Sequence, residues 1–531
     1  MRLFGLLLVV LLLLLTACSS GGSEGTTEED SAEVQAAQAG EDPGETVELQ
    51  RSWESTSVVE SPGGASAASV AVSRAFFVTS PAVVLAPADD RAAVDEGAQA
   101  AAEAGVPLLL FGGAASPSSS NDDDAASTSA GPADRAAGTV EEVRRLEAER
   151  ALLVGERTTQ TLESALDIEV VSRPDELPAL QEVEGLSDLA VLVLDDDDVE
   201  PATRTAATAT ATAAGATVLT TTYPDVRADP ELVSELADSA PDHVVGIGAP
   251  FGPADQLASR VELAKTGVQL PGGGQTLFPG RRLVALYGTP GTPGLGVLGE
   301  QDLEATIERA RDLAAEYEPL TQVPVVPTLE IIATVAQGAP GADGDYSGEV
   351  SVDTLRPWVE RAGEEGVYVV LDLQPGRSSF LDQARRYEEL LRMPHVGLAL
   401  DPEWRLAPDE VPLGQIGRVQ ADEVNSVITW LADLTEQESL PQKLLVLHQF
   451  RISMLPDSQD YDLSRDEVRV LVHMDGQGPT GDKEKTWAAV TEAAPDRVPF
   501  GWKNFYDEDI PMLSPAETMD REPVPFMVSY Q

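Results

Sequence analysis

The sequence predicts an α/β protein in which an N-terminal parallel-sheet domain precedes a (β/α)8 barrel. Short apolar runs alternate with helical stretches, which is the pattern of parallel strands joined by crossover helices. In the first domain this pattern occurs twice, about a hundred residues apart, which indicates an internal duplication. In the second domain eight apolar runs lie within about 250 residues, the usual length of a (β/α)8 barrel.

The chain begins with the pattern of an export signal. Arg2 is an early positive charge, and the apolar run 3–15 is too short to span a bilayer as a helix. The run ends at Leu15-Thr16-Ala17-Cys18, which resembles the lipobox of bacterial lipoproteins. The resemblance implies removal of residues 1–17, a diacylglyceryl group on the Cys18 thiol and acylation of the new N-terminus.

The cysteine count supports this interpretation. Cys18 is the single cysteine of the chain, so it has no partner for an intramolecular disulfide in an oxidising compartment. More than one acyl chain makes anchoring stable. We therefore expect an extracytoplasmic protein that is held at a membrane surface by the lipid on Cys18. An ordinary secretory signal followed by a chance cysteine is the alternative.

The composition limits the partners. The formal net charge is −55, which excludes nucleic acid as a general partner because phosphate-backbone binding needs a Lys/Arg surface. The same charge disfavours a polyanionic wall polymer as a ligand unless cations bridge the two. Hydrophobic residues make up 42% of the chain, which is enough for full-sized cores. We interpret the acidic surface as a means of solubility or as a fit to a salty habitat.

Two segments frame the first folded domain. The segment 18–65 is rich in Ser, Gly, Glu and Ala and has few apolar residues, so we expect a lipid-anchored, disordered tether. The duplicated α/β domain is expected over 66–280, up to the glycine-rich turn at 271–274. Its expected strands are Ala82–Ala86, Pro107–Phe111, Ala151–Gly155, Leu189–Leu194, Ala216–Thr221 and Val244–Gly248. Its expected helices are 88–104, Thr139–Glu149, Pro201–Ala214 and Pro230–Ser239, with a polar loop over Ser116–Ala133.

The order of these elements resembles the bacterial cell-wall-binding repeat. The segment Gly105-Val106-Pro107-Leu108-Leu109-Leu110 fits the middle strand of that family's pattern, and 152–155 and 245–248 fit its last strand loosely. The family's Asp-Ala-Leu is replaced by Ala88-Asp89-Asp90-Arg91, and the second copy lacks the Pro-Leu-Leu element. The resemblance implies contact with cell-wall material; a generic doubly wound α/β domain is the alternative.

The barrel is expected over 281–531. Its eight expected strands are Leu283–Tyr287, Val325–Ile331, Val367–Leu373, Val396–Leu400, Leu444–His448, Val468–His473, Val498–Trp502 and Pro525–Ser529. Helical spacing between them is found at Glu304–Glu316, Val352–Gly363, Phe380–Arg392, Ala421–Thr435 and Lys483–Ala493. The last gaps contain little helix, so we expect the barrel to be irregular there.

Polar residues follow the ends of these apolar runs. Barrel enzymes build their active sites from side chains at the C-terminal ends of the strands, so these residues are expected to converge in one cleft. The candidates are Tyr287, Glu330, Asp372, Gln374, Asp401, Glu403, His448, Gln449, His473, Asp475, Trp502, Lys503 and Tyr506. Each residue alone has a structural explanation, and the inference rests on their shared position.

Paired carboxylates beside aromatic rings are what glycoside hydrolysis requires. We expect Glu403 to act as the acid, with Asp401 or Asp372 as its partner, and the remaining candidates to bind substrate. The segment 397–404 is similar to strand ends of glycosidase-like barrels, although it matches no single family. The function expected is therefore that of an envelope protein whose barrel binds or hydrolyses glycans.

Two alternatives remain open. The first is a surface protein that binds wall material or a saccharide without catalysis, because fold alone does not define function. The second is metal-assisted hydrolysis, with His448, His473, Asp372 and Asp401 as acceptable ligands of a divalent ion. The His-x-His of common barrel metallohydrolases is missing, and the sequence contains no P-loop or well-placed dinucleotide fingerprint. We therefore expect no cofactor and no metal site, except that the second alternative leaves a divalent metal ion open.

Overall fold

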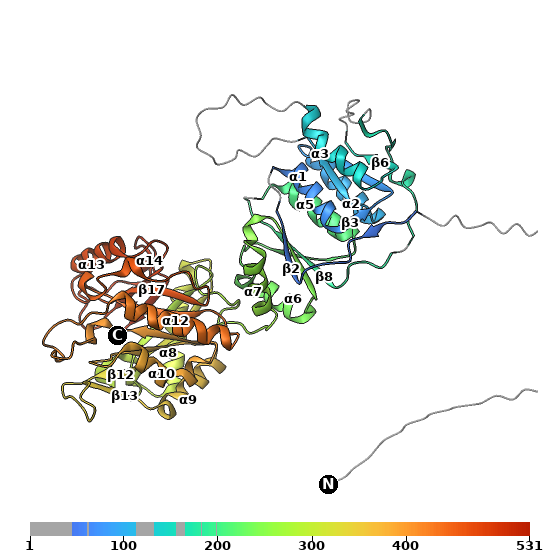
Figure 1. Ribbon diagram of the computed structural model, residues 1–531. Helices are drawn as coiled ribbons and strands as arrows, with labels where there is room; N and C mark the ends of the chain where they lie inside the picture. Colours follow the sequence, from blue (N-terminus) through green and yellow to red (C-terminus); the bar gives the residue numbers. More distant parts are fainter. Residues whose placement is uncertain (1–44, 61–62, 113–131, 156–164, 182, 198) are drawn as a thin grey trace, which may run out of the picture. The chain divides into compact units, whose positions relative to one another are not determined.

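The computed structural model describes residues 45–60, 63–112, 132–155, 165–181, 183–197 and 199–531 (Figure 1). The expected signal peptide, Cys18, the first part of the tether and most of the expected polar loop at Ser116–Ala133 lie outside these residues. Residues Glu45–Gln531 form one compact unit. In the described ranges, no helix combines the length and the apolar character needed to cross a membrane.

The first sheet contains the strands expected from the first copy of the α/β pattern. Its four parallel strands lie in the order β5 (Leu108–Phe111), β4 (Ala82–Pro87), β6 (Arg150–Leu153) and β7 (Glu169–Val171). Helix α2 (Arg91–Ala104) connects β4 to β5, and helix α3 (Pro132–Arg145) precedes β6. Asp90 caps α2 by accepting a hydrogen bond from the Ala93 amide, and Gly105 ends it in the left-handed conformation.

Three strands of the second sheet follow the same order as three strands of the first, and the fourth comes from an earlier part of the chain. The second sheet contains β9 (Thr217–Thr221), β8 (Leu189–Leu194), β10 (His243–Ile247) and β2 (Thr56–Val59), again all parallel. In both sheets the first strand of a copy lies between the second and the third. Helices α5 (Pro201–Ala213) and α6 (Pro230–Ser239) lie close to the expected bounds. The common origin of the two copies stays a prediction.

The strand β2 corrects the expected tether. Thr56–Val59 fell within the segment 18–65, yet these residues pair with β10 in a buried sheet. The short strand β1 (Glu48–Leu49) pairs antiparallel with β3 (Phe77–Thr79). The expected tether therefore does not extend over residues 45–65, because the two short apolar runs in this segment pair with strands elsewhere in the chain.

Two of the described helices in the α/β domain were not expected from the sequence. Helix α1 (Ala65–Phe76) carries mostly Ala, Ser and Val, and it packs against α5 and α3. Helix α7 (Ala254–Ala264) follows β10 and covers β2. The apolar spacing in α1 is interrupted by buried serines, of which Ser73 donates a hydrogen bond to Glu142 and Ser69 to the Ser66 carbonyl. Because these buried positions are polar, the segment lacks the apolar periodicity that predicts a helix.

The C-terminal domain is a closed barrel of eight parallel strands, which confirms the expected fold class. The first strand pairs with both the second and the last, and this closes the sheet. The strands, in barrel order, are β11 (Arg282–Gly288), β12 (Val325–Ala336), β14 (Tyr368–Leu373), β15 (Val396–Leu400), β16 (Lys443–His448), β17 (Val468–Met474), β18 (Phe500–Asn504) and β19 (Met527–Tyr530). A short strand, β13 (Ser347–Glu349), extends β12 as an antiparallel hairpin.

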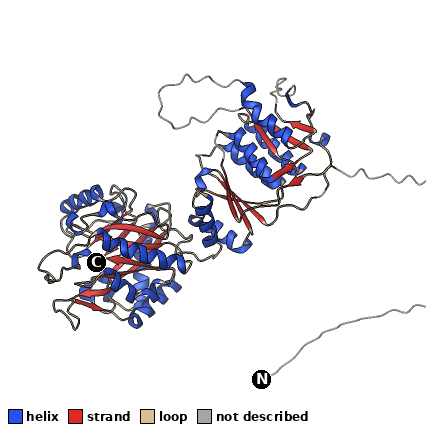
Figure 2. Ribbon diagram, viewed as in Figure 1, coloured by secondary structure: helices blue, strands red, loops and turns tan. Residues whose placement is uncertain are grey.

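Helices surround this barrel (Figure 2). They are α8 (Leu303–Ala315), α9 (Val352–Glu364), α10 (Phe380–Arg386), α11 (Glu388–Leu391), α12 (Ala421–Gln437), α13 (Thr480–Ala493) and α14 (Pro515–Met519). The expected helix Phe380–Arg392 is divided at Tyr387, whose hydroxyl donates to the carbonyls of Ala333 and Val350. Between β16 and β17 the described chain forms two 3-10 turns in place of a long helix, as the short gap predicted.

The barrel interior changes from apolar to polar along its axis. Successive strand residues alternate between the interior and the surrounding helices. The interior apolar residues form one cluster: Leu283, Ala285, Val326, Tyr368, Val370, Ala399, Leu444, Val446, Leu471 and Met527. Two positions further along several strands, the inward side chains become Tyr287, Asp372, Asp401, His448 and His473. The apolar layers therefore fill the barrel on the N-terminal side of the polar layer.

The packing of His473 in the barrel interior can be tested at Gly501. Gly501 pairs in register with His473 on the neighbouring strand, and a Cβ at position 501 would overlap the His473 ring. We expect Gly501→Ala to destabilise the barrel by ~1–3 kcal/mol through overpacking, measured as a lower melting temperature. The control is Gly481→Ala in α13, where no atom lies within 4 Å of the added Cβ. Equal stability of Gly501→Ala and wild type would contradict the interior placement of His473.

Candidate active site in the barrel

A cavity of about 620 Å³ opens at the C-terminal end of the barrel strands. Six of the expected site residues line it, which are Tyr287, Gln374, Asp401, Glu403, Asp475 and Lys503. They come from five different strand ends, so the closed sheet brings together side chains that are far apart in sequence. The cavity also has lining residues that the sequence did not indicate, among them Trp404, Phe450, Arg451, Gln477, Phe505 and Gln531.

The end of β15 supplies two carboxyl groups. Asp401 is buried, and its Oδ1 accepts a hydrogen bond of 3.1 Å from the Glu403 amide across the 3-10 turn Pro402–Trp404. Burial raises the pKa of Asp401 well above its usual range, and the charge of Asp372 adds to the effect. Burial and the charge of Asp475 raise the pKa of Glu403 to about 7. Glu403 therefore exchanges a proton near neutral pH.

A buried charge network lies beneath these two groups, with His448 at its centre. His448 Nε2 lies 2.8 Å from Glu330 Oε1 and 3.9 Å from Asp372 Oδ1, while Nδ1 lies 3.2 Å from Asp475 Oδ2. Burial alone would lower the pKa of His448, but the charges of Glu330 and Asp475 outweigh it and raise the pKa well above 6.5. The imidazolium in turn keeps the pKa of Asp475 low against the effect of burial.

Asp372 connects this network to Tyr287. The Tyr287 hydroxyl donates a hydrogen bond of 2.9 Å to Asp372 Oδ2, and Gln374 donates to the same hydroxyl at 3.4 Å. Burial raises the pKa of Asp372 to about 6, although the charge of His448 opposes the shift. Asp372 and Glu330 are buried below the cavity and do not line it. They influence the cavity through His448 and Tyr287.

His473 and Gln449 are placed as supports. His473 Nε2 lies 2.7 Å from Ser529 Oγ, and its ring centre lies 5.2 Å from that of His448. Burial and the charge of His448 lower the pKa of His473 well below 6.5, so it is neutral next to an imidazolium. Gln449 donates a hydrogen bond of 3.3 Å to the Arg451 carbonyl and thereby orders the loop after β16. Neither residue lines the cavity.

Trp502 and Tyr506 lie away from the cavity. Trp502 is 0% exposed and packs outside the barrel against Trp487 of α13, because its neighbour Lys503 points inward and strand residues alternate. Tyr506 is 42% exposed and contacts Tyr530. The aromatic surface expected from these two residues is instead supplied by Trp404, Phe450 and Phe505.

The sequence does contain a signal for these aromatic residues. Trp404 directly follows Glu403, Phe450 follows the pair His448-Gln449, and Phe505 lies two positions after Lys503. Each belongs to the loop after a strand whose end was already a candidate. The candidate residues were chosen at the strand ends. The cavity extends about one or two residues further, into the loops that follow the strands, where barrel enzymes place much of their active site.

The described residues contain one group of acidic side chains close enough together to hold a metal ion, and it lies outside the barrel cavity. Among the described residues, one acidic group brings three ligand atoms within 4.8 Å of one another, and it consists of Asp343, Asp345 and Glu349 near β13. Its central member is already engaged, because Asp345 accepts from the Ser347 amide at 2.9 Å and from Ser378 Oγ at 2.6 Å. The four candidate ligands in the barrel, which are His448, His473, Asp372 and Asp401, do not form such a group among the described residues.

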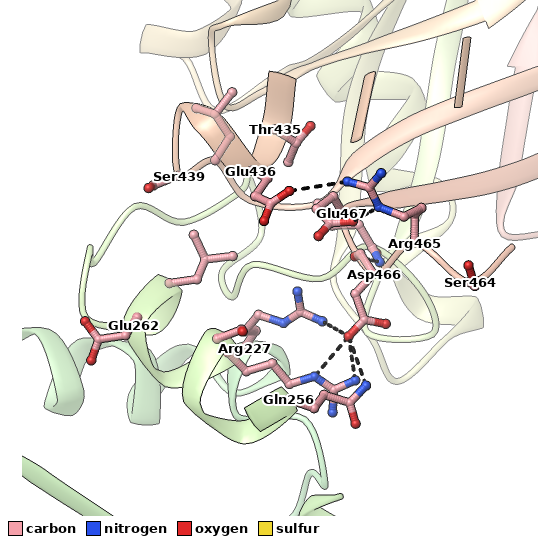
Figure 3. Close-up of a pocket in the computed structure, with 15 residues that line it drawn as sticks. Arg227, Gln256, Glu262, Thr435, Glu436, Ser439, Ser464, Arg465, Asp466 and Glu467 are labelled. Atoms are coloured by element: carbon pink, nitrogen blue, oxygen red, sulfur yellow. Dashed lines mark hydrogen bonds and ion pairs between the residues drawn. The ribbon is translucent and has the colours of Figure 1, made fainter. Parts of the chain in front are cut away.

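A second pocket, of about 500 Å³, has its charges internally paired (Figure 3). Asp466 accepts from Arg260 at 2.7 Å, from Arg227 at 3.3 Å and from Gln256 at 3.4 Å. Arg227 is also paired with Asp225 at 2.7 Å. This network connects the segment after β9 to the loop before β17, and we interpret it as structural.

The chain was compared with protein-family models, with curated proteins and with solved structures, and no significant match was found. The barrel fold is established by its own strand pairing. The resemblances to the lipobox, to the wall-binding repeat and to glycosidase barrels stay interpretations of the sequence. Conclusions about chemistry therefore rest on the cavity itself.

The raised pKa of Glu403 predicts a pH-dependent stability. A carboxyl group whose pKa is about 7 in the folded state and 4.5 in the unfolded state stabilises the protonated fold, and this contribution is lost as pH rises through that range. Wild type should therefore lose stability relative to Glu403→Gln between pH 4.5 and 7. Urea unfolding followed by tryptophan fluorescence measures this, since Trp53 is the only tryptophan outside the barrel.

The matched control is Asp409→Asn, an exposed change in the same loop. It should leave the pH dependence of wild type in place. A constant stability difference between wild type and Glu403→Gln across this range would show that the Glu403 carboxyl is not perturbed by burial.

Proposed function

We propose that the barrel is a glycoside hydrolase that acts on glycans of the bacterial cell envelope. The observation that carries the proposal is the Glu403 carboxyl group, which has a pKa of about 7 and lines a cavity that it shares with other carboxyl groups. A general acid is most effective when its pKa is close to the working pH. Cleavage of a glycosidic bond requires such an acid and a second, ionised carboxylate.

The charges favour Asp475 as the ionised partner. Asp475 lines the cavity and its pKa is lowered by His448, whereas burial raises the pKa values of Asp401 and Asp372. In the proposed reaction Glu403 donates its proton to the leaving oxygen while Asp475 acts as nucleophile or base. Asp401 supports Glu403 by accepting the hydrogen bond of its backbone amide. This differs from the sequence expectation, which favoured Asp401 or Asp372 as the partner.

The remaining cavity walls suit a sugar. Trp404, Phe450 and Phe505 offer apolar faces, and Gln374, Gln477 and Gln531 offer amides that can both donate and accept hydrogen bonds from hydroxyls. A volume of about 620 Å³ lies within the range of small-ligand sites. The cavity therefore has space for a short stretch of a glycan chain.

The location of the reaction is part of the proposal. We infer from residues 2–18 that the protein is exported and is held at a membrane surface by lipid on Cys18. The α/β domain would then contact wall material, as its resemblance to wall-binding repeats implies. Wall glycan would be the substrate within reach of such an enzyme.

The function is tested by Glu403→Gln. Loss of the acid should reduce the release of reducing ends from purified wall glycan by about 10²- to 10⁴-fold, while the circular dichroism spectrum stays unchanged. In wild type the rate should fall as pH rises through about 7, because Glu403 loses its proton there. Asp409→Asn is the control and should keep wild-type activity. A wild-type protein that binds the glycan without cleaving it would instead support a saccharide-binding lipoprotein.

The anchor is tested by Cys18→Ala. The variant has no thiol to carry the lipid, so the protein should move from the membrane fraction to the soluble fraction of the producing cells. Immunoblotting of the two fractions measures the change, and Ser19→Ala is the matched control. Retention of Cys18→Ala in the membrane fraction would exclude lipid on Cys18 as the anchor.

A further inference from the structure

We propose that Lys503 and Arg451 form an anion-binding subsite in the barrel cavity, and that the glycan bound there carries a carboxylate on its sugar. The inference rests on the proposed function, because it names the class of substrate that the same cavity accepts. It is carried by two cationic side chains that line the cavity without an acidic partner.

Lys503 lies in the cavity wall, and its ammonium group forms no ion pair within 4.0 Å with any described residue. The residue is 3% exposed, and its Nζ lies 3.3 Å from the centre of the Tyr287 ring and 5.2 Å from that of Phe505. The aromatic faces stabilise the charge through cation–π contacts but accept none of its three protons in a normal hydrogen bond. In the described chain no carboxylate oxygen lies within 4.0 Å of Nζ. The donors therefore remain available to a ligand.

Arg451 is the second unpaired cation at the cavity. Its guanidinium lies 5.8 Å from the Phe450 ring centre, and no ion pair or side-chain hydrogen bond joins it to another described residue. Its charge acts on Glu403, as does that of Lys503, so both cations lie near the proposed acid. Most other arginines of the barrel, such as Arg361 and Arg465, have acidic partners. In a chain of net charge −55, two cations left unpaired at one cavity indicate a site for an anion.

The surroundings favour a carboxylate over a phosphate. Asp401, Glu403 and Asp475 line the same cavity, so a doubly charged group would meet stronger repulsion than a singly charged one. A guanidinium binds a carboxylate through two parallel hydrogen bonds, and an ammonium adds a point charge. We therefore assign the subsite to an acidic sugar, such as one with a free carboxylate on a ring or on an ether-linked side chain.

The experiment compares two forms of one glycan. Wall glycan strands freed of their peptides, and so bearing free carboxylates, are compared with the same strands after reduction of those carboxylates to alcohols. Binding is followed by fluorescence, since Trp404 lines the cavity. Wild type should bind the acidic strands at least about tenfold more tightly, which corresponds to ~1.4 kcal/mol. Arg451→Gln and Lys503→Gln should each remove most of this preference.

A charge-matched control completes the design. Arg385→Gln removes an exposed arginine on α10 that has no partner in the described chain, and it should retain the preference for acidic strands. Equal binding of the two strands by wild type would overturn the subsite, even if both were cleaved. Arg451-dependent binding of acidic strands without cleavage would support the subsite and refute the hydrolase. The experiment can therefore contradict the anion subsite and the glycoside hydrolase independently of each other.

Discussion

The barrel site depends on one buried imidazole that stands among three carboxyl groups. His448 lies within 4 Å of oxygens of Glu330, Asp372 and Asp475, in a region with almost no contact with solvent. Without the imidazolium these acids would repel each other and pay the full cost of desolvation. With it, Asp475 stays ionised, whereas burial raises the pKa values of Asp372 and Asp401 even though the charge of His448 opposes both shifts. The charge of His448 and the burial of these acids therefore determine which of the carboxyl groups carry a proton.

The barrel architecture makes this arrangement possible. Apolar interior layers exclude water beneath the network, and the closed sheet places strand ends from distant parts of the chain side by side. The register aligns His448 with His473, and the narrow space beside His473 is provided by Gly501. The neutral His473, hydrogen-bonded to Ser529, then keeps a second charge away from His448. The positions of His448 and His473 in the charge network therefore depend on the strand register and on the glycine at position 501.

The strands of the barrel could be predicted from sequence because each is a continuous apolar run that ends in a polar residue. Convergence of Asp401, Glu403 and Asp475 followed from the parallel register alone. The direction of Trp502 did not, because a residue next to the strand end can face either the cavity or the helices, and only its packing against Trp487 decides this. Helix α1 and strand β2 were missed because the first has serines in its buried face and the second is four residues long.

The route of β2 has a consequence for how the α/β domain is assembled. Thr56–Val59 precede every strand of the first sheet, yet they form an edge of the second sheet beside β10. The second sheet is therefore complete only when the chain has passed through all of the first. A cut between the two copies would leave the first half with all four strands of its sheet and would remove β2 from the second sheet. The two copies are therefore interlaced, and β2 can pair with β10 only after the intervening chain has been synthesised.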